Sequence, residues 1–371
     1  MKNKNKLITF IMGTRPEIIK LAPLIIHSKR LKSINVRIVL TGQHKEMARD
    51  VMELFDLKED NNLQIMKSNQ SLNYISISIL KGLKNEFKFH RPDLVIVQGD
   101  TTSAFISALG AFYEGIKLAH IEAGLRTNNI LSPYPEEANR RLISQIATIN
   151  FAPTNNALEN LKKEGIHKNV FLTGNTVIDA ISLLIKNKRI KKDNFFKENK
   201  NLKLILVTVH RRENWGKELI NIIEALIQIV KINQDVGIVL PMHKNKEIRK
   251  VLIKYLENID RIFLKDSLLY DNFVGILSQS YCVLTDSGGI QEEAPFLGKP
   301  VLVLRDSTER VESIKSGSAI LVGTNPKIII EKVNRIISDP KVYKSMSVKR
   351  SIYGDGKASK KILKKCIDLL N

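Results

Sequence analysis

The chain has 371 residues, of which 43% are hydrophobic and 26% charged, a composition that excludes disordered, collagen-like and coiled-coil proteins. Its length predicts two domains, at roughly 100–200 residues per domain, with a core large enough to need no disulfide or metal. The 59 Lys and Arg outnumber the 38 Asp and Glu, for a net charge of +21, but they are scattered without a basic–aromatic motif, so we expect solvated lysines and no nucleic-acid partner.

The chain opens on a basic stretch followed by the apolar run Leu7–Met12. This order imitates a signal peptide, but the run is too short and continues directly into Arg15, so it predicts a first buried strand. No stretch approaches the roughly 20 apolar residues that span a bilayer, and we expect no membrane partner. The two cysteines, Cys282 and Cys366, lie far apart; they predict neither a disulfide framework nor a zinc site and fit a reducing, cytoplasmic location.

Short apolar runs alternate with helical patterns along the chain. The first half contains predicted strands at Leu7–Met12, Val36–Thr41, Leu94–Gln98, Lys117–Ile121, Thr148–Ala152 and Val170–Thr173. The second half contains predicted strands at Leu204–Val209, Gly237–Pro241, Arg261–Leu264, Cys282–Thr285, Val301–Leu304 and Ala319–Val322. Amphipathic stretches such as Leu219–Ile232 lie between them. This alternation predicts parallel α/β sheets in two sets that divide near the basic segment Lys186–Lys203, and therefore two doubly wound domains.

Ligands of such sheets bind beyond the carboxyl ends of the strands. The segments that follow predicted strands are Gly13–Glu17, Gly99–Ser103, Glu122–Arg126, His210–Asn214, Asp286–Gly289 and Arg305–Asp306. Charged residues and glycines therefore gather at one end of both sheets. We expect a cleft there, between two facing domains.

Two of these segments have the character of anion sites. Arg15 and Lys20 lie near the start of a predicted helix, where cations are unfavourable unless an anion is bound; the alternative is a pair of solvated surface cations. The segment Asp286–Glu293 predicts a glycine turn between a strand and a helix, and the backbone amides of such a turn can approach an anion. The alternative is a plain tight turn. The segment is neither a Walker A loop nor a G-x-G-x-x-G loop. Glu293, one turn into the helix, can accept ribose hydroxyls.

Three carboxylates are candidates for acid/base chemistry. Asp100 and Glu122 follow adjacent predicted strands and can converge, whereas Glu136 opens a helix and could be an ordinary first-turn acid. Near a bound diphosphate, the pKa of a carboxylate rises and makes it a usable acid or base. His210 and His243 end predicted strands without a partner at metal-ligand spacing, so no metal is expected.

Six motifs together identify a family. They are Arg15-Pro16-Glu17 with Lys20, Gly99–Thr102, His120–Arg126, Pro135–Arg140, His210–Asn214 and Thr285–Glu293. From about Thr9 to about Gly323, the chain resembles the non-hydrolysing UDP-N-acetylglucosamine 2-epimerases rather than their hydrolysing relatives. The resemblance implies a GT-B fold of two Rossmann-like domains, residues 1–173 and a UDP-binding domain of residues 174–355, with a helix in 356–371 packing back on the first. It also implies a homodimer without cofactor.

The resemblance also implies roles for individual residues. It makes Asp100, Glu122, Glu136 and His210 the catalytic set, with His210 also beside the diphosphate. Its substrate-binding set is Arg15, Lys20, Phe273, Ser287, Gly288, Gly289, Glu293 and Arg310. Leu268 stands where some members have Gln. A second UDP-sugar site, which activates bacterial members, matches Gln43, Gln70, Glu136, Arg211 and His243, with Asn69 in place of a common Arg.

The implied reaction inverts C2 of UDP-N-acetylglucosamine. Departure of UDP makes the C2 hydrogen removable and leaves 2-acetamidoglucal, to which UDP adds back with a proton from the other face. The product, UDP-N-acetylmannosamine, is expected to serve surface polysaccharide synthesis. Three alternatives remain at this stage: a 2-epimerase of a uronate or deoxy analogue, a GT-B glycosyltransferase, and a non-catalytic sensor of nucleotide sugars.

Overall fold

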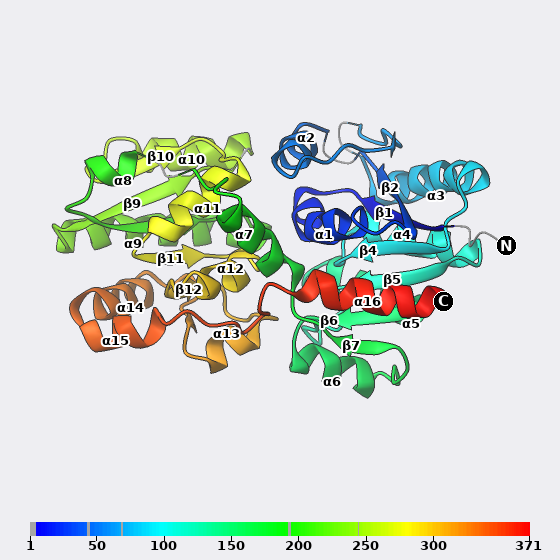
Figure 1. Cartoon of the computed structure of the whole chain (residues 1–371). Helices are drawn as coiled ribbons and strands as arrows, with labels where there is room; N and C mark the ends of the chain where they lie inside the picture. The colour runs from blue at the N-terminus through cyan, green and yellow to red at the C-terminus, as the bar shows by residue number, and fades with distance from the viewer. Residues whose placement is uncertain (1–4, 43–44, 68–69, 192–193, 244) are drawn as a thin grey trace. The chain divides into compact units, whose positions relative to one another are not determined.

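The chain folds into two compact units (Figure 1). The computed structural model describes residues 5–42, 45–67, 70–191, 194–243 and 245–371. The N-terminal unit consists of Met1–Leu183 with Tyr353–Asn371, and the C-terminal unit of Leu184–Ile352. Each unit is built on one parallel sheet with helices on its faces, so the chain has the two Rossmann-like units of the GT-B fold, as the sequence predicts.

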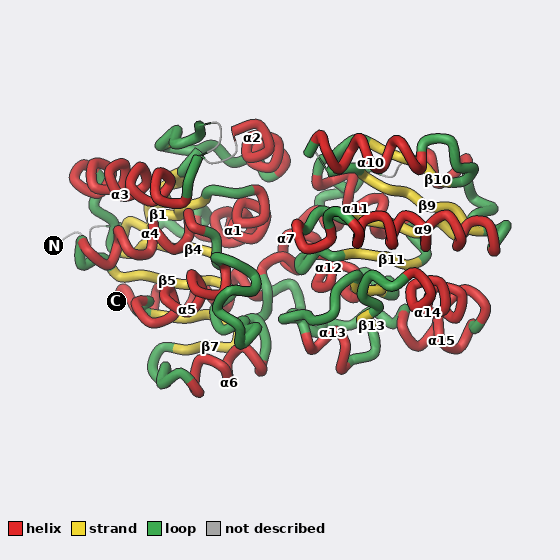
Figure 2. The backbone as a smooth tube through the Cα atoms, turned by 180° about the vertical axis from the view of Figure 1, so that it is seen from behind, coloured by secondary structure: helices red, strands yellow, loops and turns green. Residues whose placement is uncertain are grey.

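The N-terminal unit has a sheet of seven strands in the order β3-β2-β1-β4-β5-β6-β7. Its strands are β1 (Lys6–Met12), β2 (Ile34–Leu40), β3 (Asn61–Asn62), β4 (Leu94–Gln98), β5 (Lys117–Ile121), β6 (Ile149–Ala152) and β7 (Val170–Leu172). Its helices are α1 (Arg15–Ser28), α2 (Lys45–Leu54), α3 (Leu72–Phe89), α4 (Thr102–Tyr113), α5 (Glu136–Ile146), α6 (Asn155–Lys163), α7 (Thr176–Lys186) and α16 (Ala358–Leu370). Helices α3, α4 and α5 cover one face of the sheet (Figure 2), and α1 packs with α16 on the other (Figure 1).

The C-terminal unit has a sheet of six strands in the order β10-β9-β8-β11-β12-β13. Its strands are β8 (Lys203–Thr208), β9 (Val236–Pro241), β10 (Ile262–Lys265), β11 (Cys282–Thr285), β12 (Val301–Val303) and β13 (Ala319–Leu321). Its helices are α8 (Phe195–Glu198), η1 (Arg212–Asn214), α9 (Lys217–Ile232), α10 (Lys246–Leu256), α11 (Tyr270–Gln279), α12 (Ile290–Phe296), α13 (Val311–Lys315), α14 (Pro326–Ser338) and α15 (Pro340–Met346).

Every apolar run that predicts a strand is a strand in the structure, with ends within two residues of the predicted ones. The sequence analysis missed β3, because its residues Asn61 and Asn62 carry no apolar signal.

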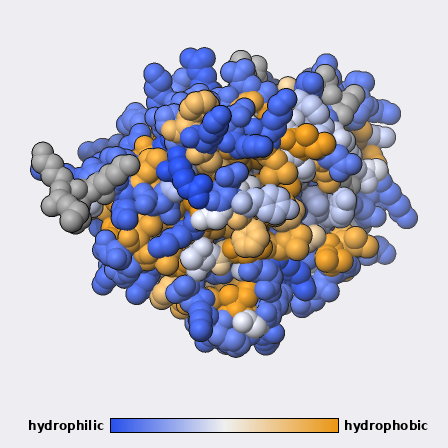
Figure 3. Space-filling model, turned by 90° about the vertical axis from the view of Figure 1, so that its right-hand side faces the viewer, coloured by the Kyte–Doolittle hydropathy of each residue, from blue (hydrophilic) through white to orange (hydrophobic). Residues whose placement is uncertain are grey.

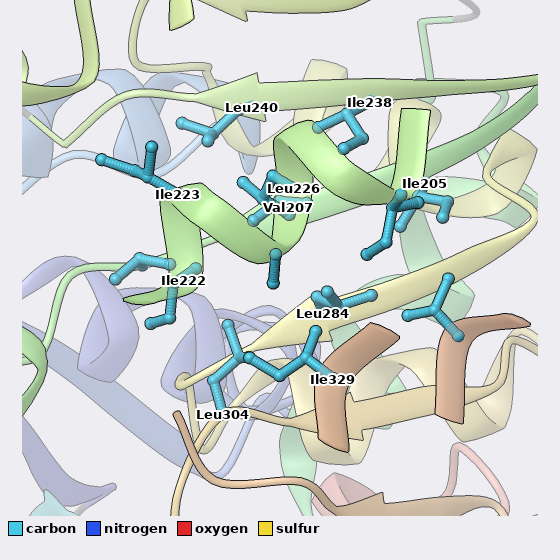
Figure 4. Packing of buried hydrophobic residues seen from close by; sticks show 14 of the residues in the cluster. Ile205, Val207, Ile222, Ile223, Leu226, Ile238, Leu240, Leu284, Leu304 and Ile329 are labelled. Atoms are coloured by element: carbon cyan, nitrogen blue, oxygen red, sulfur yellow. The ribbon is translucent and has the colours of Figure 1, made fainter. Parts of the chain in front are cut away.

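Helix α9 shows how an amphipathic pattern determines packing. Its apolar residues recur at helical spacing and pack on β8 and β9 in a buried cluster that includes Ile205, Val207, Ile222, Ile223, Leu226, Ile238, Leu240, Leu284, Leu304 and Ile329 (Figure 4).

The boundaries between the units lie at Leu183/Leu184 and Ile352/Tyr353, whereas the sequence analysis placed them at 173/174 and 355/356. The difference comes from the start of α7, which is bound to the returning chain. The Asn175 amide donates to the Tyr353 carbonyl at 2.6 Å. The buried Asp179 carboxylate accepts the Ala358 and Ser359 amides at 3.1 and 2.8 Å and caps α16. No helix in the described part of the chain is long and apolar enough to cross a membrane.

Candidate functional site

Both sheets reverse their winding between two neighbouring strands. In the N-terminal unit, β1 and β4 pair directly although the chain between them forms the β2–β3 half of the sheet. In the C-terminal unit, β8 and β11 hold the same position. Ligands of open α/β sheets bind at this switch point, because the loops that follow the two strands diverge to opposite faces. The loops at these points carry Arg15, Asp100, His210 and Ser287–Gly289.

The loop after β1 is held tightly against its neighbours. A Cβ atom at Gly13 would collide with Ser103 and Thr41. The Glu17 carboxylate, 2% exposed, accepts the Gly13 and Thr14 amides at 2.6 Å each and the Thr101 hydroxyl from the loop after β4. Burial raises the pKa of Glu17, and these hydrogen bonds oppose that rise. Arg15, half-buried, is the first residue of the helix that this loop begins.

Glu122 follows β5 and lies in a buried polar cluster. Its Oε2 atom accepts hydrogen bonds from Lys20 Nζ and, at 2.6 Å, from Gln98 Nε2. The backbone of Glu122 has φ = 67°, a left-handed conformation that is uncommon for a residue other than glycine. Such strain persists only where surrounding contacts hold it, and it is concentrated at functional sites. The structure thus brings Lys20 and Glu122, two predicted site residues, into direct contact.

Asp100 is fixed from α5. Its Oδ2 atom lies 2.5 Å from Arg140 Nη2, and its carbonyl oxygen accepts Asn139 Nδ2 at 2.9 Å. Its side chain keeps 27% of its surface exposed, whereas that of Arg140 keeps 4%. Asp100 is therefore an oriented carboxylate with a solvent-accessible face, which a catalytic acid or base needs.

The adjacent acids Glu136 and Glu137 have different environments. Glu137 is fully buried and binds Arg141 Nε at 2.9 Å, the Thr127 amide at 3.1 Å and Arg140 Nη1 at 3.4 Å. Glu136, the first residue of α5, is half-buried. Glu137 thus belongs to the framework that positions Arg140, whereas the Glu136 side chain keeps part of its surface exposed.

In the C-terminal unit, Asp286 joins the loops after β8 and β11. Its fully buried carboxylate accepts the His210 and Arg211 amides, both at 2.9 Å, and Asn214 Nδ2 at 3.0 Å. His210 Nδ1 lies 2.8 Å from the other carboxylate oxygen. Burial acts to raise the pKa of Asp286, but the hydrogen bonds and charge of His210 outweigh it and lower the pKa. With Nδ1 bound to a carboxylate, the imidazole of His210 is held in one orientation.

Gly288 marks a close approach of an arginine to the loop after β11. A Cβ atom at this position would lie 2.6 Å from Arg310 Cζ. Arg310 is buried and binds Glu309 and, at 3.0 Å, Glu292 Oε1. The Ser287 amide donates to Thr285 Oγ1 at 2.9 Å, so the glycines are the residues of this turn that lie beside a buried guanidinium, an arrangement suited to a polyanion.

Glu309 is shared by three arginines. Beside its contact with Arg310, it lies 3.0 Å from Arg305 Nη1 and 3.8 Å from Arg211 Nη2. Burial opposes ionisation of Glu309, but the three guanidinium groups prevail and hold its pKa far below the usual range. Burial and the nearby Arg305 lower the pKa of Arg211.

Glu293 and Phe273 belong to two helices of the C-terminal unit, α12 and α11. Glu293, 6% exposed, belongs to α12 and accepts a hydrogen bond from Tyr270 Oη at 2.8 Å. Phe273 lies one turn after Tyr270 in α11 and packs on the core of this unit. Leu268, which precedes α11, packs on the same cluster.

The residues of the expected second site are described only in part. Gln43 and Asn69 lie outside the described residues. Gln70 accepts the Lys67 amide at 3.2 Å. Arg211 and His243 follow the neighbouring strands β8 and β9, and the rings of His243 and His210 stack at 6.2 Å. Burial and the proximity of His210 lower the pKa of His243.

The sequence analysis assigned no role to Glu17, Asp286 or Glu309. Helix-capping spacing was a signal for Glu17, since Thr14 and Glu17 occupy the positions of a capping box. No local sequence pattern predicts the partners of Asp286 and Glu309. Within the described ranges, no group of three or more His, Cys, Asp or Glu side chains is placed to hold a metal ion.

Comparison with known proteins places both units in one family. Residues 27–366 match the sequence profile described as UDP-N-acetylglucosamine 2-epimerase. The chain is 47% identical over 369 residues to a protein of that name from Campylobacter jejuni, with 96% of each chain covered. The crystal structure of the UDP-GlcNAc 2-epimerase from Neisseria meningitidis bound to UDP-GlcNAc has 42% identity and a TM-score of 0.92, and covers 98% of this chain and all 100% of its own. The S. aureus MnaA–UDP co-structure has 41% identity, a TM-score of 0.94 and coverage of 99% and 97%.

The arginine cluster around Glu309 predicts a pH-dependent stability. Because the pKa of Glu309 in the folded protein lies below its ordinary value of 4.5, its ionisation stabilises the fold above that pH, and the contribution is lost as the pH falls further. We expect Glu309→Gln to lower the free energy of unfolding by about 3–5 kcal/mol near neutral pH, since it removes one partner of buried ion pairs. The difference from the wild type should shrink as the pH falls below 4.5 in urea titrations. Glu331→Gln, an exposed change in the same unit, should have little effect; a constant Glu309→Gln deficit across the pH range would contradict the ion-pair account.

Proposed function

The chain belongs to the UDP-N-acetylglucosamine 2-epimerase family, and from that premise we propose that it interconverts UDP-N-acetylglucosamine and UDP-N-acetylmannosamine without releasing the free sugar. The observation that carries this proposal is that the strand ends of the two units bear different kinds of group. Oriented carboxylates, Asp100 and Glu122, follow strands of the N-terminal sheet, and a glycine turn over buried Arg310 follows a strand of the C-terminal sheet. The first set suits proton transfer at carbon, and the second suits a diphosphate.

The C-terminal unit supplies the nucleotide contacts in this proposal. The diphosphate lies at Ser287, Gly288 and Gly289, with Arg310 behind the turn. Glu293 accepts the ribose hydroxyls, and Tyr270 Oη orients its carboxylate through a hydrogen bond to Oε1. Phe273 packs beside the uracil. Backbone amides and a guanidinium that are already in place cost little reorganisation when negative charge develops on the departing UDP.

The N-terminal unit supplies the acid/base groups and two further cations. Arg15 and Lys20 join the diphosphate contacts. The C2 hydrogen of the sugar is removed on one face and a proton is delivered to the other, so two separately positioned groups are needed. Asp100, Glu122 and Glu136 form the pool from which these groups come. Asp100 is paired with Arg140, and Glu122 accepts hydrogen bonds from Lys20 and Gln98. Glu136 is the first residue of α5.

The reaction balances as an elimination followed by an addition. The bond between C1 and the β-phosphate oxygen breaks as a carboxylate takes the C2 proton, which yields 2-acetamidoglucal and UDP. The oxygen of UDP then rebinds C1 while a proton reaches C2 from the opposite face. No redox step occurs, and the chain has no G-x-G-x-x-G loop for a nicotinamide. His210, oriented by Asp286, stabilises the leaving UDP.

Exchange with solvent tests the elimination. If the enzyme removes and returns a C2 proton, epimerisation in D₂O places deuterium at C2 of the product, and NMR will show loss of the C2 proton signal. Incubation with UDP-N-acetylglucosamine alone also separates this activity from that of a glycosyltransferase, which needs an acceptor. Parallel incubations with uronate and deoxy analogues identify the preferred sugar. Complete retention of the C2 hydrogen in the product would exclude the mechanism.

Two kinds of substitution should separate chemistry from binding. We expect Asp100→Asn, Glu122→Gln and Glu136→Gln to reduce turnover by about 10²–10⁴ while UDP affinity stays within a few-fold, because the amide keeps the shape and removes the base. Glu293→Ala should instead weaken UDP binding, since hydrogen bonds to a charged acceptor contribute about 1.5–3 kcal/mol each. Calorimetric titration with UDP and initial rates give both quantities. Tyr270→Phe, which keeps the carboxylate, should show a smaller loss than Glu293→Ala.

We also propose that the protein is a homodimer formed through the helical face of the N-terminal unit. Large apolar side chains near the ends of α3 and α4 are exposed, with Phe89 at 75%, Phe112 at 52% and Tyr113 at 69%. Figure 3 shows hydrophobic residues at the surface among hydrophilic ones. The rings of Phe112 and Tyr113 lie 6.4 Å apart, and exposed apolar patches are typical of protein–protein interfaces.

The dimer is tested by its mass in solution. Phe89→Glu with Tyr113→Glu should convert a dimer to a monomer in light scattering coupled to size exclusion, because two charges would be buried unpaired at the interface. Ile232→Glu, a change at a side chain 56% exposed in the C-terminal unit, serves as the control and should leave the mass unchanged. A wild-type monomer at all protein concentrations would refute the proposal.

A further inference from the structure

Glu17 makes contacts that a helix cap does not require. Its Oε2 atom accepts the Gly13 and Thr14 amides at 2.6 Å, which is the ordinary function of an acid in the first turn of a helix. Its Oε1 atom accepts the hydroxyl of Thr101, 84 residues away in the sequence. The side chain is 2% exposed, so both oxygens are committed to the protein. Glu17 therefore connects the loop after β1 to the loop after β4.

The Thr101 hydroxyl makes two hydrogen bonds, and the direction of each is defined. It is the N-cap of α4, and its Oγ1 atom accepts the Ala104 amide at 3.0 Å. Since Glu17 has no proton to donate when ionised, the hydroxyl donates to Glu17 while it accepts from Ala104. The contact between the loops thus has a defined direction, and it depends on a carboxylate at position 17 and a hydroxyl at position 101.

The residues beside this contact are those of the proposed chemistry. Gly13 and Thr14 lead into Arg15, the proposed diphosphate contact, and Thr101 follows Asp100, a proposed acid/base group. Asp100 is tied on its other side by Arg140 at 2.5 Å. A displacement of either loop would change the separation between a cation of the leaving-group site and a carboxylate of the proton-transfer site.

We propose that Glu17 is a positioning residue, which through Thr101 holds the Arg15 loop and the Asp100 loop at the separation that the epimerisation requires. This inference rests on the proposed function. Glu17 touches no substrate in this account; it acts on turnover through the placement of Arg15 and Asp100. A misplacement of reacting groups by about 1 Å can cost about 10²-fold in rate, so a buried hydrogen bond remote from the reacting atoms can control kcat.

The sharpest test uses threonine caps of two helices in the same unit. Thr101→Val removes the cap of α4 and the contact with Glu17, whereas Thr154→Val removes only the cap of α6, where Thr154 Oγ1 accepts the Ala157 amide at 3.2 Å. Both changes should lower the thermal midpoint, and Thr101→Val by more, because it also leaves the buried Glu17 Oε1 without its donor. Only Thr101→Val should reduce kcat, by about 10²-fold, with UDP affinity within a few-fold. Thr101→Ser, which keeps the hydroxyl, should restore turnover.

A double-mutant cycle shows whether Glu17 acts through Thr101. Glu17→Gln should also reduce kcat, because an amide cannot accept from both sides, and the double variant with Thr101→Val should be no slower than the slower single variant. Asp179→Asn serves as the matched control, since Asp179 is equally buried and accepts the Ala358 and Ser359 amides at the start of α16. Multiplicative losses in the double variant, or equal losses in Asp179→Asn, would overturn the inference.

Hydrogen exchange gives a readout that does not need catalysis. Thr101→Val should speed exchange of the Gly13 and Thr14 amides, which donate to Glu17, whereas Thr154→Val should not. Unchanged exchange at these amides in Thr101→Val would show that the loops are not coupled, whatever the rates. If the wild type has no epimerase activity but the exchange is coupled, the proposed function fails and the coupling of the two loops stands.

Discussion

In each sheet, one buried carboxylate joins the two loops at the switch point, and the placement of that unit's site residues depends on this joint. Glu17 ties the loop after β1 to the loop after β4, and Asp286 ties the loop after β11 to the loop after β8. Each accepts two backbone amides from one loop. A loop that ends a parallel strand has unpaired backbone groups, and a carboxylate that binds them in the interior both satisfies the amides and sets their position.

The two joints differ in charge, and this difference matches the proposed roles of the units. Glu17 has neutral hydrogen-bond donors, and burial raises its pKa. Asp286 has His210 beside it, and its pKa is lowered despite complete burial. In the C-terminal unit, a firmly ionised carboxylate orients an imidazole next to a turn that suits a diphosphate. In the N-terminal unit, the joint leaves the cationic partners Lys20 and Arg140 to the carboxylates Glu122 and Asp100.

Around the turn at Gly288, the buried charges neutralise one another within the protein. Three arginines converge on Glu309, so their repulsion is balanced within the protein and does not require a ligand. Arg310 is consequently in place before a polyanion arrives, and its guanidinium lies against Gly288, where a Cβ atom would force the guanidinium to move. The same fold serves unrelated activities in other proteins, so the functional argument rests on these residues and on the family, rather than on the two sheets.

The sequence by itself determined the strands, the division into two α/β units and the strand ends at which the site residues lie, because apolar periodicity and glycine turns are local signals. It also identified the family, since six motifs had to occur together. Only the tertiary structure decided that Glu137 is framework while the adjacent Glu136 is half-buried, and that Glu122 is strained and bound to Lys20. It also showed that Glu17 and Asp286 join loops, because their partners lie 84 and 76 residues away and are brought close by strand order alone.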